Sequence, residues 1–335
     1  MRTTSLIGGA LTRPRPRPLA LGIAAALVAV TAGACSSNSA GPSNGGLPVV
    51  SGAVGQEATI VLPADVKAPI TLATKTLVQG SGSVLANGDL AVVNYTAMDW
   101  TNAKVLGTTY SEDGGKTPNQ PQVVTLGTGG LIPAWNLALT GARVGSRIEV
   151  VSPPADAFGT AGSAKAGVSG TDDLVFVLDV VGGYPANADI TGTQGPQADP
   201  SLPQVSGNPG SGNPTITIPA GVKPPTSLIS DTLVKGTGAT VVKGQTLILQ
   251  YTGVDWNTGK NFDSSFTRKQ AYSVVIGAGQ VIPGWDDGLV GKHVGDRVLL
   301  VVPPIDGYGP SGGQKQAGIG ADDTLVFVVD IIDAL

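Results

Sequence analysis

Residues 281–289 read Val281-Ile282-Pro283-Gly284-Trp285-Asp286-Asp287-Gly288-Leu289. The proline suits the first turn of a helix, where no backbone N–H is needed, so we expect a short helix over residues 283–290 with Trp285 facing inward. A weaker copy, Leu131-Ile132-Pro133-Ala134-Trp135-Asn136-Leu137, stands earlier in the chain. Two such tryptophans among strand-like sequence predict two copies of one domain, each built around a pocket with a tryptophan floor.

The composition is typical of strands and turns, and it excludes several kinds of chemistry. The chain has 335 residues, enough for two domains, with 49 Gly, 25 Pro and 13% charged residues. One Cys (Cys35) and one His (His293) exclude a Cys/His zinc site and a Ser–His–Asp triad in the first half. We expect His293 to be a solvated turn residue. No run of Lys and Arg follows the N-terminus, so we expect no nucleic-acid partner.

Residues 1–34 predict an export signal. They carry four arginines and no acidic residue, and their apolar run over residues 19–30 is too short to span a membrane. The residues that follow resemble a bacterial lipobox ending at Cys35, which predicts a lipid anchor on the extracellular face of the cell membrane. An alternative stays open, because Ala32-Gly33-Ala34 also suits ordinary signal peptidase, which would give a secreted protein.

Two repeats and two connecting segments divide the rest of the chain. We expect a flexible tether over residues 35–58 and an unstructured Pro/Gly-rich linker over residues 185–214. Residues 59–184 and 215–335, here called the first and second domains, match one another in the same order. The matching segments include Thr76-Leu77-Val78 with Thr232-Leu233-Val234, Asn94-Tyr95-Thr96 with Gln250-Tyr251-Thr252, Arg143-Val144-Gly145-Ser146-Arg147 with His293-Val294-Gly295-Asp296-Arg297, and Ser152-Pro153-Pro154 with Val302-Pro303-Pro304.

Alternating apolar residues predict strands, because every second side chain of a strand faces the same side. In the second domain we expect strands over residues 247–251, 271–276, 297–302 and 325–331, with only residues 283–290 helical. The predicted fold class is α+β. Each domain would be a curved, mostly antiparallel sheet with one short helix against it.

The motifs of the second domain, taken together, resemble those of the FKBP-type peptidyl-prolyl cis–trans isomerases. They are Tyr251-Thr252-Gly253, Gly259-Lys260-Asn261-Phe262-Asp263-Ser264-Ser265, Val281-Ile282-Pro283-Gly284-Trp285, Gly307-Tyr308-Gly309 and Leu325-Val326-Phe327. The resemblance covers nearly all of residues 216–335 and, more weakly, residues 59–184. It implies a sheet wrapped on the helix, with a proline pocket between them.

The resemblance also implies which residues form this pocket. Trp285 would be the floor, Asp263 and Tyr308 the polar rim, and Arg268 would pair with or orient Asp263. The backbone N–H of Ile282 and the hydroxyl of Tyr308 would hold substrate carbonyls. The substrate-binding walls would be Tyr251, Phe262, Tyr272, Val281, Ile282, Ile319 and Phe327. Taken singly, each residue is more readily explained as core or turn, and it is their joint occurrence at the family's spacing that favours a site.

The activity that the resemblance implies is prolyl cis–trans isomerisation, which would assist the folding of exported polypeptides that contain proline. A dry aromatic pocket would stabilise the twisted transition state, in which amide resonance is broken. This chemistry requires no cofactor, no metal and no covalent intermediate. Macrolide inhibitors would be a second class of ligand for the same pocket.

The first domain departs from the pattern. Leu106-Gly107 stand where the second domain has Phe262-Asp263, and Phe158 stands where it has Tyr308. The remaining pocket residues are Tyr95, Ile132, Trp135 and Phe176. We therefore expect a degenerate copy that keeps the pocket floor and loses the rim, with activity mainly in the C-terminal domain.

Two other classes of function compete with this one. A non-catalytic chaperone or adhesion module would use both pockets only to bind segments that contain proline. A solute-binding lipoprotein would need long α/β segments with crossover helices, and the sequence lacks them.

Overall fold

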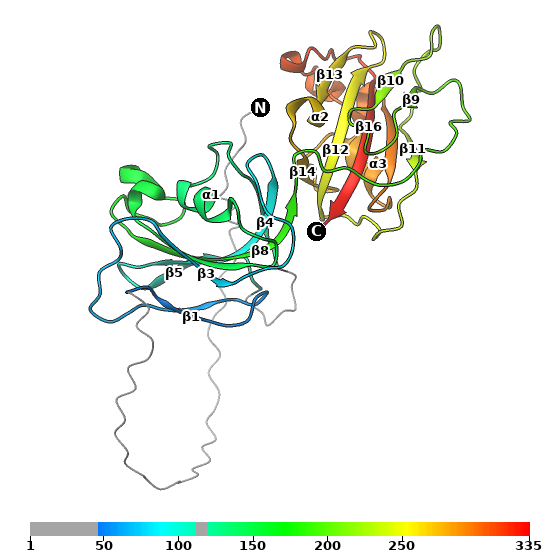
Figure 1. Cartoon of the computed structure of the whole chain (residues 1–335). Coiled ribbons are helices and arrows are strands. Elements are labelled where there is room, and N and C mark those ends of the chain that lie inside the picture. Colours follow the sequence, from blue (N-terminus) through cyan, green and yellow to red (C-terminus); the bar gives the residue numbers. More distant parts are fainter. Residues whose placement is uncertain (1–45, 112–118) are drawn as a thin grey trace, which may run out of the picture.

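The computed structural model describes residues 46–111 and 119–335 and shows two domains of one architecture (Figure 1). Each domain contains a six-stranded antiparallel sheet and a separate two-stranded sheet. The predicted α+β class, with two tandem copies, is therefore confirmed. The predicted export signal and Cys35 lie outside the described residues.

The first domain, which the structure extends back to β1, contains eight strands and one α-helix among its described residues. The strands are β1 (Val49–Ser51), β2 (Thr59–Val61), β3 (Ala73–Val78), β4 (Leu90–Asp99), β5 (Lys104–Thr108), β6 (Gln122–Thr125), β7 (Arg147–Ser152) and β8 (Leu174–Tyr184). The helices are α1 (Pro133–Leu139) and the short 3-10 turns η1 (Pro154–Asp156) and η2 (Gly159–Ala161).

The second domain, which the structure extends back to β9, repeats these elements and adds two short helical elements. Its strands are β9 (Gln204–Ser206), β10 (Thr215–Thr217), β11 (Ile229–Val234), β12 (Thr246–Asp255), β13 (Asn261–Ser264), β14 (Tyr272–Val275), β15 (Arg297–Val302) and β16 (Leu325–Ala334). Its helices are α2 (Ser265–Arg268), α3 (Pro283–Leu289) and the 3-10 turns η3 (Pro304–Asp306), η4 (Gly309–Ser311) and η5 (Lys315–Ala317).

The two large sheets have the same strand order, as expected of a duplicated domain. The order is β3-β7-β8-β4-β5 in the first, with β6 pairing β4, and β11-β15-β16-β12-β13 in the second, with β14 pairing β12. The register also corresponds, because Ala97 pairs with Gly107 where Gly253 pairs with Asp263. Gly107 therefore occupies the position of Asp263 in space as well as in sequence.

A short helix covers the inner face of each sheet. The predicted helix over residues 283–290 is α3, and its proline stands in the first turn as expected. Trp285 and its counterpart Trp135 are 4% and 1% exposed, each within the inner core of its domain. Close packing of α3 on β15 requires a glycine at Gly284, because an added Cβ would lie 2.5 Å from Val302 Cγ1.

A two-stranded hairpin covers the outer face of each sheet, and this was not predicted. Hairpin β1–β2 buries Ile60 among residues of β4, β7 and β8, and hairpin β9–β10 buries Val205 among residues of β12, β15 and β16. We expected a flexible tether up to residue 58, and this was wrong for β1. We expected an unstructured linker over residues 185–214, and this was wrong for β9. Because both faces are covered, β8 and β16 read as nearly continuous apolar runs.

A buried ion pair fastens each hairpin to its sheet. Arg147 donates to Asp179 at 2.6 Å, and Arg297 donates to Asp330 at 2.6 Å, with all four side chains at most 2% exposed. A further guanidinium N–H group of each arginine donates to a carbonyl in the segment that joins the two hairpin strands, at Gly52 in the first domain and Gly207 in the second. These contacts satisfy charges that would be costly to bury alone.

Helix α2 was also missed, because we expected residues 283–290 to be the only helical segment. It is a single turn, too short to show a helical period. The side chain of Ser264 caps it by accepting from Thr267 N at 3.4 Å, and Lys269 ends it in the left-handed conformation with φ 51°. Its importance is that it carries Arg268 to the pocket.

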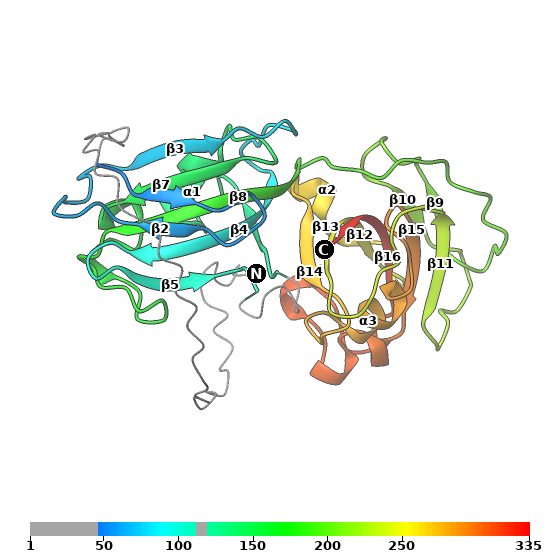
Figure 2. The same ribbon diagram turned by 90° about the horizontal axis from the view of Figure 1, so that it is seen from below.

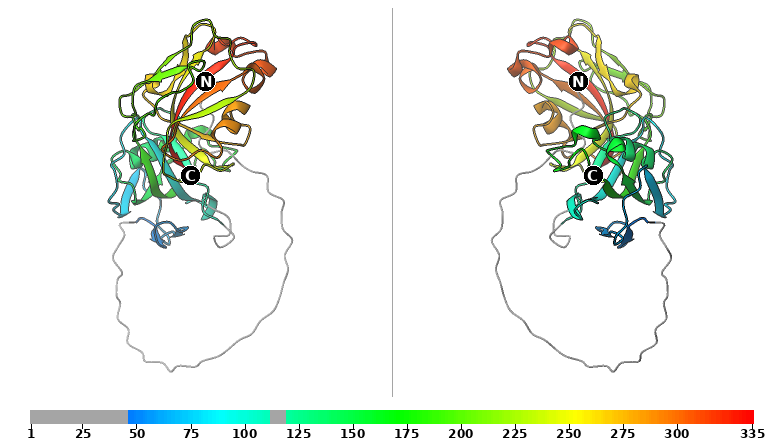
Figure 3. Two further views of the ribbon diagram at one scale, coloured as in Figure 1. Left: turned by 90° about the vertical axis from the view of Figure 1, so that its right-hand side faces the viewer. Right: turned by 90° about the vertical axis from the view of Figure 1, so that its left-hand side faces the viewer.

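The two domains contact one another along the side of the second domain that carries β14 and α2 (Figures 2 and 3). Tyr184, the last residue of β8, donates from its hydroxyl to Asp333. The side-chain amide of Gln250 donates to the carbonyls of Ala186 and Ala188 at 2.9 and 3.1 Å, just after β8. The first part of the predicted linker is thereby bound to the second domain.

Candidate active site

One pocket of the second domain brings all of its predicted site residues together. Its volume of about 650 Å³ is within the usual range of about 300–1,000 Å³ for small-ligand sites. It lies between the inner face of the sheet and α3, and residues 280–282 and 314–319 contribute to its lining. The predicted residues that line it are Tyr251, Phe262, Asp263, Arg268, Tyr272, Val281, Ile282, Trp285, Tyr308, Ile319 and Phe327.

The floor of the pocket is a cluster of aromatic rings around Trp285. The ring centroid of Trp285 lies 5.2 Å from Tyr251, 5.3 Å from Phe327 and 6.3 Å from Tyr272, all in edge-to-face arrangements. Phe262 packs edge-on against Phe327 at 5.5 Å. Such contacts hold the rings at fixed angles and leave an apolar surface of aromatic faces and edges.

A charged group stands at the edge of this floor. Arg268 donates from Nη1 to the carboxylate of Asp263 and from Nη2 to the hydroxyl of Tyr251 at 3.0 Å. The hydroxyl of Tyr251 itself donates to Asp263, and the guanidinium carbon of Arg268 lies 5.3 Å from the ring centroid of Tyr251. Three side chains from β12, β13 and α2 therefore fix one another at the rim.

Burial keeps the pocket phenols protonated. It is the largest effect on the pKa of Tyr308, which it raises, and the neighbouring Tyr272 raises that pKa further. Burial likewise raises the pKa of Tyr251, although Arg268 opposes the shift. Tyr308 lies at the start of η4 and is half-buried, so its hydroxyl is a neutral hydrogen-bond donor facing the pocket.

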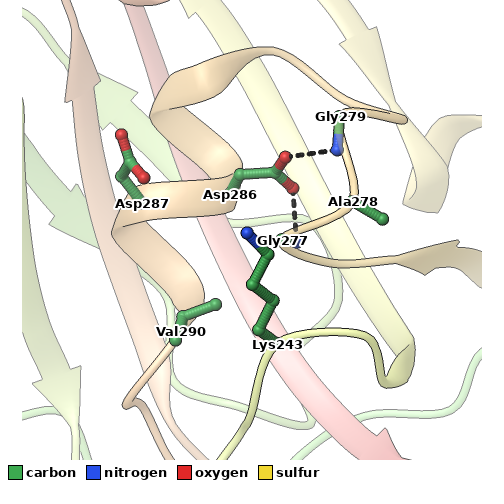
Figure 4. A pocket seen from close by; sticks show the side chains of 7 residues that line it. All are labelled: Lys243, Gly277, Ala278, Gly279, Asp286, Asp287 and Val290. Atoms are coloured by element: carbon green, nitrogen blue, oxygen red, sulfur yellow. Dashed lines mark hydrogen bonds between the residues drawn. The ribbon is translucent and has the colours of Figure 1, made fainter.

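The loop before α3 carries Val281 and Ile282 to the pocket and is held by Asp286. The carboxylate of Asp286 accepts from the backbone N–H groups of Gly277 at 2.6 Å and Gly279 at 2.8 Å (Figure 4). Among the described residues, no group accepts from the backbone N–H of Ile282, the residue that precedes the first helical turn. A ligand carbonyl could therefore bind there.

A second hollow of about 600 Å³ lies beside α3, around the same Asp286 contacts (Figure 4). Its lining is Lys243, Gly277, Ala278, Gly279, Asp286, Asp287 and Val290, which includes no aromatic ring and no residue of the aromatic pocket. The carboxylate of Asp286 in this hollow already accepts hydrogen bonds from the loop. We therefore assign it to the support of the loop rather than to ligand binding.

The first domain keeps the floor and differs at the rim. Trp135 packs edge-on against Tyr95 at 5.1 Å and Phe176 at 5.7 Å, and Ile132, Leu106 and Phe158 pack on the same core. Phe158 starts η2 with φ −100° and ψ 5°, nearly the angles of Tyr308 at η4, which are −97° and 2°. The backbone position is thus preserved while the hydroxyl is absent, and Gly107 supplies no carboxylate.

The pocket also contains residues that sequence reasoning missed. A Cβ on Gly253 would lie 2.6 Å from Phe262 and 3.0 Å from Phe327, so the two rings can meet only across a glycine. A glycine inside an apolar strand is the sequence signal for such a close approach. Two residues of the first domain, Leu90 and Thr125, line the same pocket, and no sequence signal indicates this.

Within residues 46–111 and 119–335, no group of three or more Cys, His, Asp and Glu side chains is arranged to hold a metal ion. In that same part of the chain, no helix has both the length and the apolar character needed to cross a membrane.

An antiparallel sheet wrapped on a short helix, with an aromatic pocket and a charged rim between them, is the arrangement that the FKBP resemblance implies. Comparison with known families gives the same result. The sequence profile of the FKBP-type peptidyl-prolyl cis-trans isomerases matches residues 82–181 and 238–332. The chain belongs to this family, and it carries two copies of the family's domain.

Two named bacterial relatives support the assignment. The FK506-binding protein of Streptomyces anulatus is 39% identical over 121 residues, which is 36% of this chain and 94% of that protein. The probable FK506-binding protein of Corynebacterium glutamicum is 40% identical over 122 residues, which is 36% of this chain and 98% of that protein. The crystal structure of the three FKBP domains of wheat FKBP73 aligns with 79% of this chain and 94% of its own, at 19% identity and a TM-score of 0.32.

Proposed function

We propose that the second domain, residues 215–335, catalyses the cis–trans isomerisation of X–Pro bonds, and that the first domain is a degenerate copy. The observation that carries this proposal is the rim of Asp263, Arg268 and Tyr251 beside the floor of Trp285. The first domain has Gly107 and Phe158 at the corresponding rim positions.

The pocket binds the proline ring and leaves the peptide bond exposed to the rim. The pyrrolidine ring rests on the indole of Trp285, between the rings of Tyr251 and Phe327. The free N–H of Ile282 donates to one substrate carbonyl, and the hydroxyl of Tyr308 donates to another. These contacts orient the X–Pro bond and separate it from bulk water.

Catalysis then consists of favouring the twisted amide over the planar one. The uncatalysed barrier is about 18–20 kcal/mol, because rotation breaks the resonance of the C–N bond. A planar amide has a polar carbonyl that is well hydrated. The twisted amide is less polar, so it loses less hydration free energy than the planar amide on entering an apolar pocket. An acceleration of about a million-fold requires roughly 8 kcal/mol of differential stabilisation.

The role proposed for Asp263 is electrostatic. Its carboxylate is held in place by Arg268 and by the hydroxyl of Tyr251, so no reorganisation is needed when the charge distribution of the amide changes during rotation. Arg268 acts through Asp263 and Tyr251 and is a positioning residue. No proton is transferred in this scheme, which agrees with phenols whose pKa values are raised by burial.

The proposed substrates are exported polypeptides that contain proline, and the proposed location is the extracellular face of the cell membrane. Support comes from residues 1–34, which have the charge and apolar pattern of an export signal, and from Cys35 at the end of a lipobox-like segment. Macrolides are proposed as inhibitors that occupy the same pocket, because two relatives are named for binding FK506.

One observation favours a second function for the first domain. Its aromatic floor of Tyr95, Trp135 and Phe176 is intact although its rim is not. Binding of proline needs mainly this floor, whereas catalysis in our scheme also needs the rim. The first domain would then bind segments that contain proline without isomerising them efficiently.

The test is the isomerase activity of the full chain without its export signal, on a short peptide that contains one proline. Tyr308→Phe should lower kcat/KM by about two- to ten-fold, because it removes one neutral hydrogen bond worth roughly 0.5–1.5 kcal/mol. Asp263→Leu should lower it further. The matched variant of the first domain, Phe158→Leu, should leave kcat/KM unchanged. Equal losses from Tyr308→Phe and Phe158→Leu would reject the assignment of activity to the second domain.

A further inference from the structure

One side of the pocket is supplied by the other domain. Leu90, the first residue of β4, and Thr125, the last residue of β6, line the same cavity as Tyr251 and Trp285. Leu90 and Thr125 are direct partners in the antiparallel pairing of β4 with β6. Opposite residues of an antiparallel pair point to the same face of the sheet. They therefore face the same side of the first sheet, and both border the pocket.

This surface is held against the second domain by specific contacts. The side-chain amide of Gln270 donates to the hydroxyl of Thr125 at 2.9 Å. Leu90 is 3% exposed and is buried with Ile248 and Ala271 of the second domain. Gln270 and Ala271 connect α2 to β14, and only Lys269 separates Gln270 from Arg268. The first domain thus packs on the segment that follows α2, the helical turn that carries the rim arginine.

The chemistry of this wall is uncharged. It combines the aliphatic side chain of Leu90, the hydroxyl of Thr125 and the amide of Gln270, all of which line the cavity. Such a wall can contact apolar side chains and exchange hydrogen bonds with a peptide backbone. None of these three side chains is charged, so a charged substrate side chain beside them would meet no opposite charge to compensate its desolvation. The charged residues of the cavity, Asp263 and Arg268, are paired with one another at the rim.

A polypeptide substrate needs more space than its proline ring. An extended chain advances about 3.3–3.6 Å per residue, so the neighbours of the proline leave the aromatic floor within one or two residues. The cavity of about 650 Å³ continues from that floor to the wall of Leu90 and Thr125. A polypeptide bound with its proline on the aromatic floor must therefore extend along this cavity to its edge.

We propose that the first domain completes the substrate site of the second: residues that flank the proline on one side lie against Leu90, Thr125 and Gln270. This inference rests on the proposed function of the second domain. It predicts a preference for substrates whose flanking residues on that side are uncharged. The first domain would then contribute to catalysis by binding substrate, although its own pocket lacks the rim residues.

The experiment compares two substrates on the full chain without its export signal. One is a peptide of about four residues with a central proline, and the other a peptide of about ten residues whose proline has uncharged flanks at both ends, long enough to reach the wall. The variant is Thr125→Arg, which places a bulky charge on the wall. The control is Thr76→Arg, the same substitution at an exposed position of β3, the opposite edge of the first sheet.

The measured quantity is the ratio of kcat/KM for the long peptide to kcat/KM for the short one. Thr125→Arg should lower this ratio at least about three-fold, a modest change in binding free energy. The ratio should recover when one flank of the long peptide carries Glu, and the flank that rescues identifies the side that meets the wall. Thr76→Arg should leave the ratio unchanged.

Two outcomes would be negative, and they can be told apart. An unchanged ratio in Thr125→Arg, with both peptides isomerised, would overturn the extended site and leave the proposed function intact. Absence of acceleration for either peptide by the unsubstituted protein would overturn the proposed function itself. Activity of Thr125→Arg on the short peptide also shows that the variant is folded.

Discussion

Arg268 and Asp263 form an ion pair at the rim of the aromatic pocket, and the same guanidinium reaches the hydroxyl of Tyr251 at 3.0 Å. The pair is partly exposed, at 39% for Arg268 and 26% for Asp263, so its contribution to stability is expected to be small. Its consequence is geometric. One cation fixes an acidic group and a phenol on two different strands.

The first prediction concerns this positioning role. Arg268→Met should lower kcat/KM for a short proline peptide by about two- to ten-fold, because Asp263 and Tyr251 lose one shared donor. Arg268→Lys should recover only part of the loss, since a single ammonium lacks the two-pronged geometry of guanidinium. Lys260→Met, at an exposed turn of the same domain, is the control. A steady-state assay with equal losses for Arg268→Met and Lys260→Met would refute the positioning role.

The second prediction concerns the glycine beneath the aromatic walls. Gly253→Ala introduces a Cβ within 2.6 Å of Phe262, so it should destabilise the protein by about 1–3 kcal/mol and lower activity. The first domain has Ala97 and Leu106 at these two positions. Phe262→Leu should therefore restore part of the stability when combined with Gly253→Ala. A double-mutant cycle by urea unfolding measures this coupling, and strict additivity would contradict the packing argument.

The third prediction concerns a buried carboxyl group in the first domain. Glu149 is 1% exposed, and neither of its side-chain oxygens has a hydrogen-bond partner among the described residues. Burial raises the pKa of Glu149 from 4.5 to about 7, although Lys75 on the neighbouring strand opposes the shift. The counterpart of Glu149 in the second domain is Leu299, at the same distance along the strand from Arg297.

The sign of the pH effect follows from the raised pKa. The folded state binds the proton of Glu149 more tightly than the unfolded state, so its contribution to stability is fully present below about pH 4.5 and is lost as pH rises to about 7. Glu149→Leu should therefore stabilise the first domain more at pH 8 than at pH 5. The measurement is urea unfolding at both pH values, and a stabilisation that does not change with pH would count against a buried, titrating Glu149.

The fourth prediction concerns the ion pair under the second hairpin. Arg297→Met leaves the buried carboxylate of Asp330 without its partner and should cost roughly 3–5 kcal/mol of unfolding free energy. The double variant Arg297→Met with Asp330→Leu should be more stable than Arg297→Met, because no charge then stays buried alone. Thermal unfolding of the three proteins gives the comparison. A double variant less stable than Arg297→Met would show that the pair is not the cause.

Much of the second domain's pocket could be predicted because its motifs are local in sequence. The proline before Trp285 predicts α3, alternation predicts the long strands, and the resemblance of the motifs to those of the FKBP-type isomerases implies the lining residues. Hairpin β9–β10 was missed because its strands have three residues each, within a segment rich in Gly and Pro. The wall of Leu90 and Thr125 could not be predicted, since the contact from Thr125 to Gln270 spans 145 residues.

The central claim is that catalysis belongs to the second domain, and one matched pair of variants tests it most directly. Ile282 and Ile132 occupy the same position, immediately before the first turn of α3 and of α1. The measurement is kcat/KM for a short proline peptide, with the full chain carrying either Ile282→Ala or Ile132→Ala. We predict a clear loss for Ile282→Ala, because it truncates a wall of the pocket while keeping the backbone N–H, and wild-type activity for Ile132→Ala. A loss of similar size in both variants would contradict a degenerate first domain.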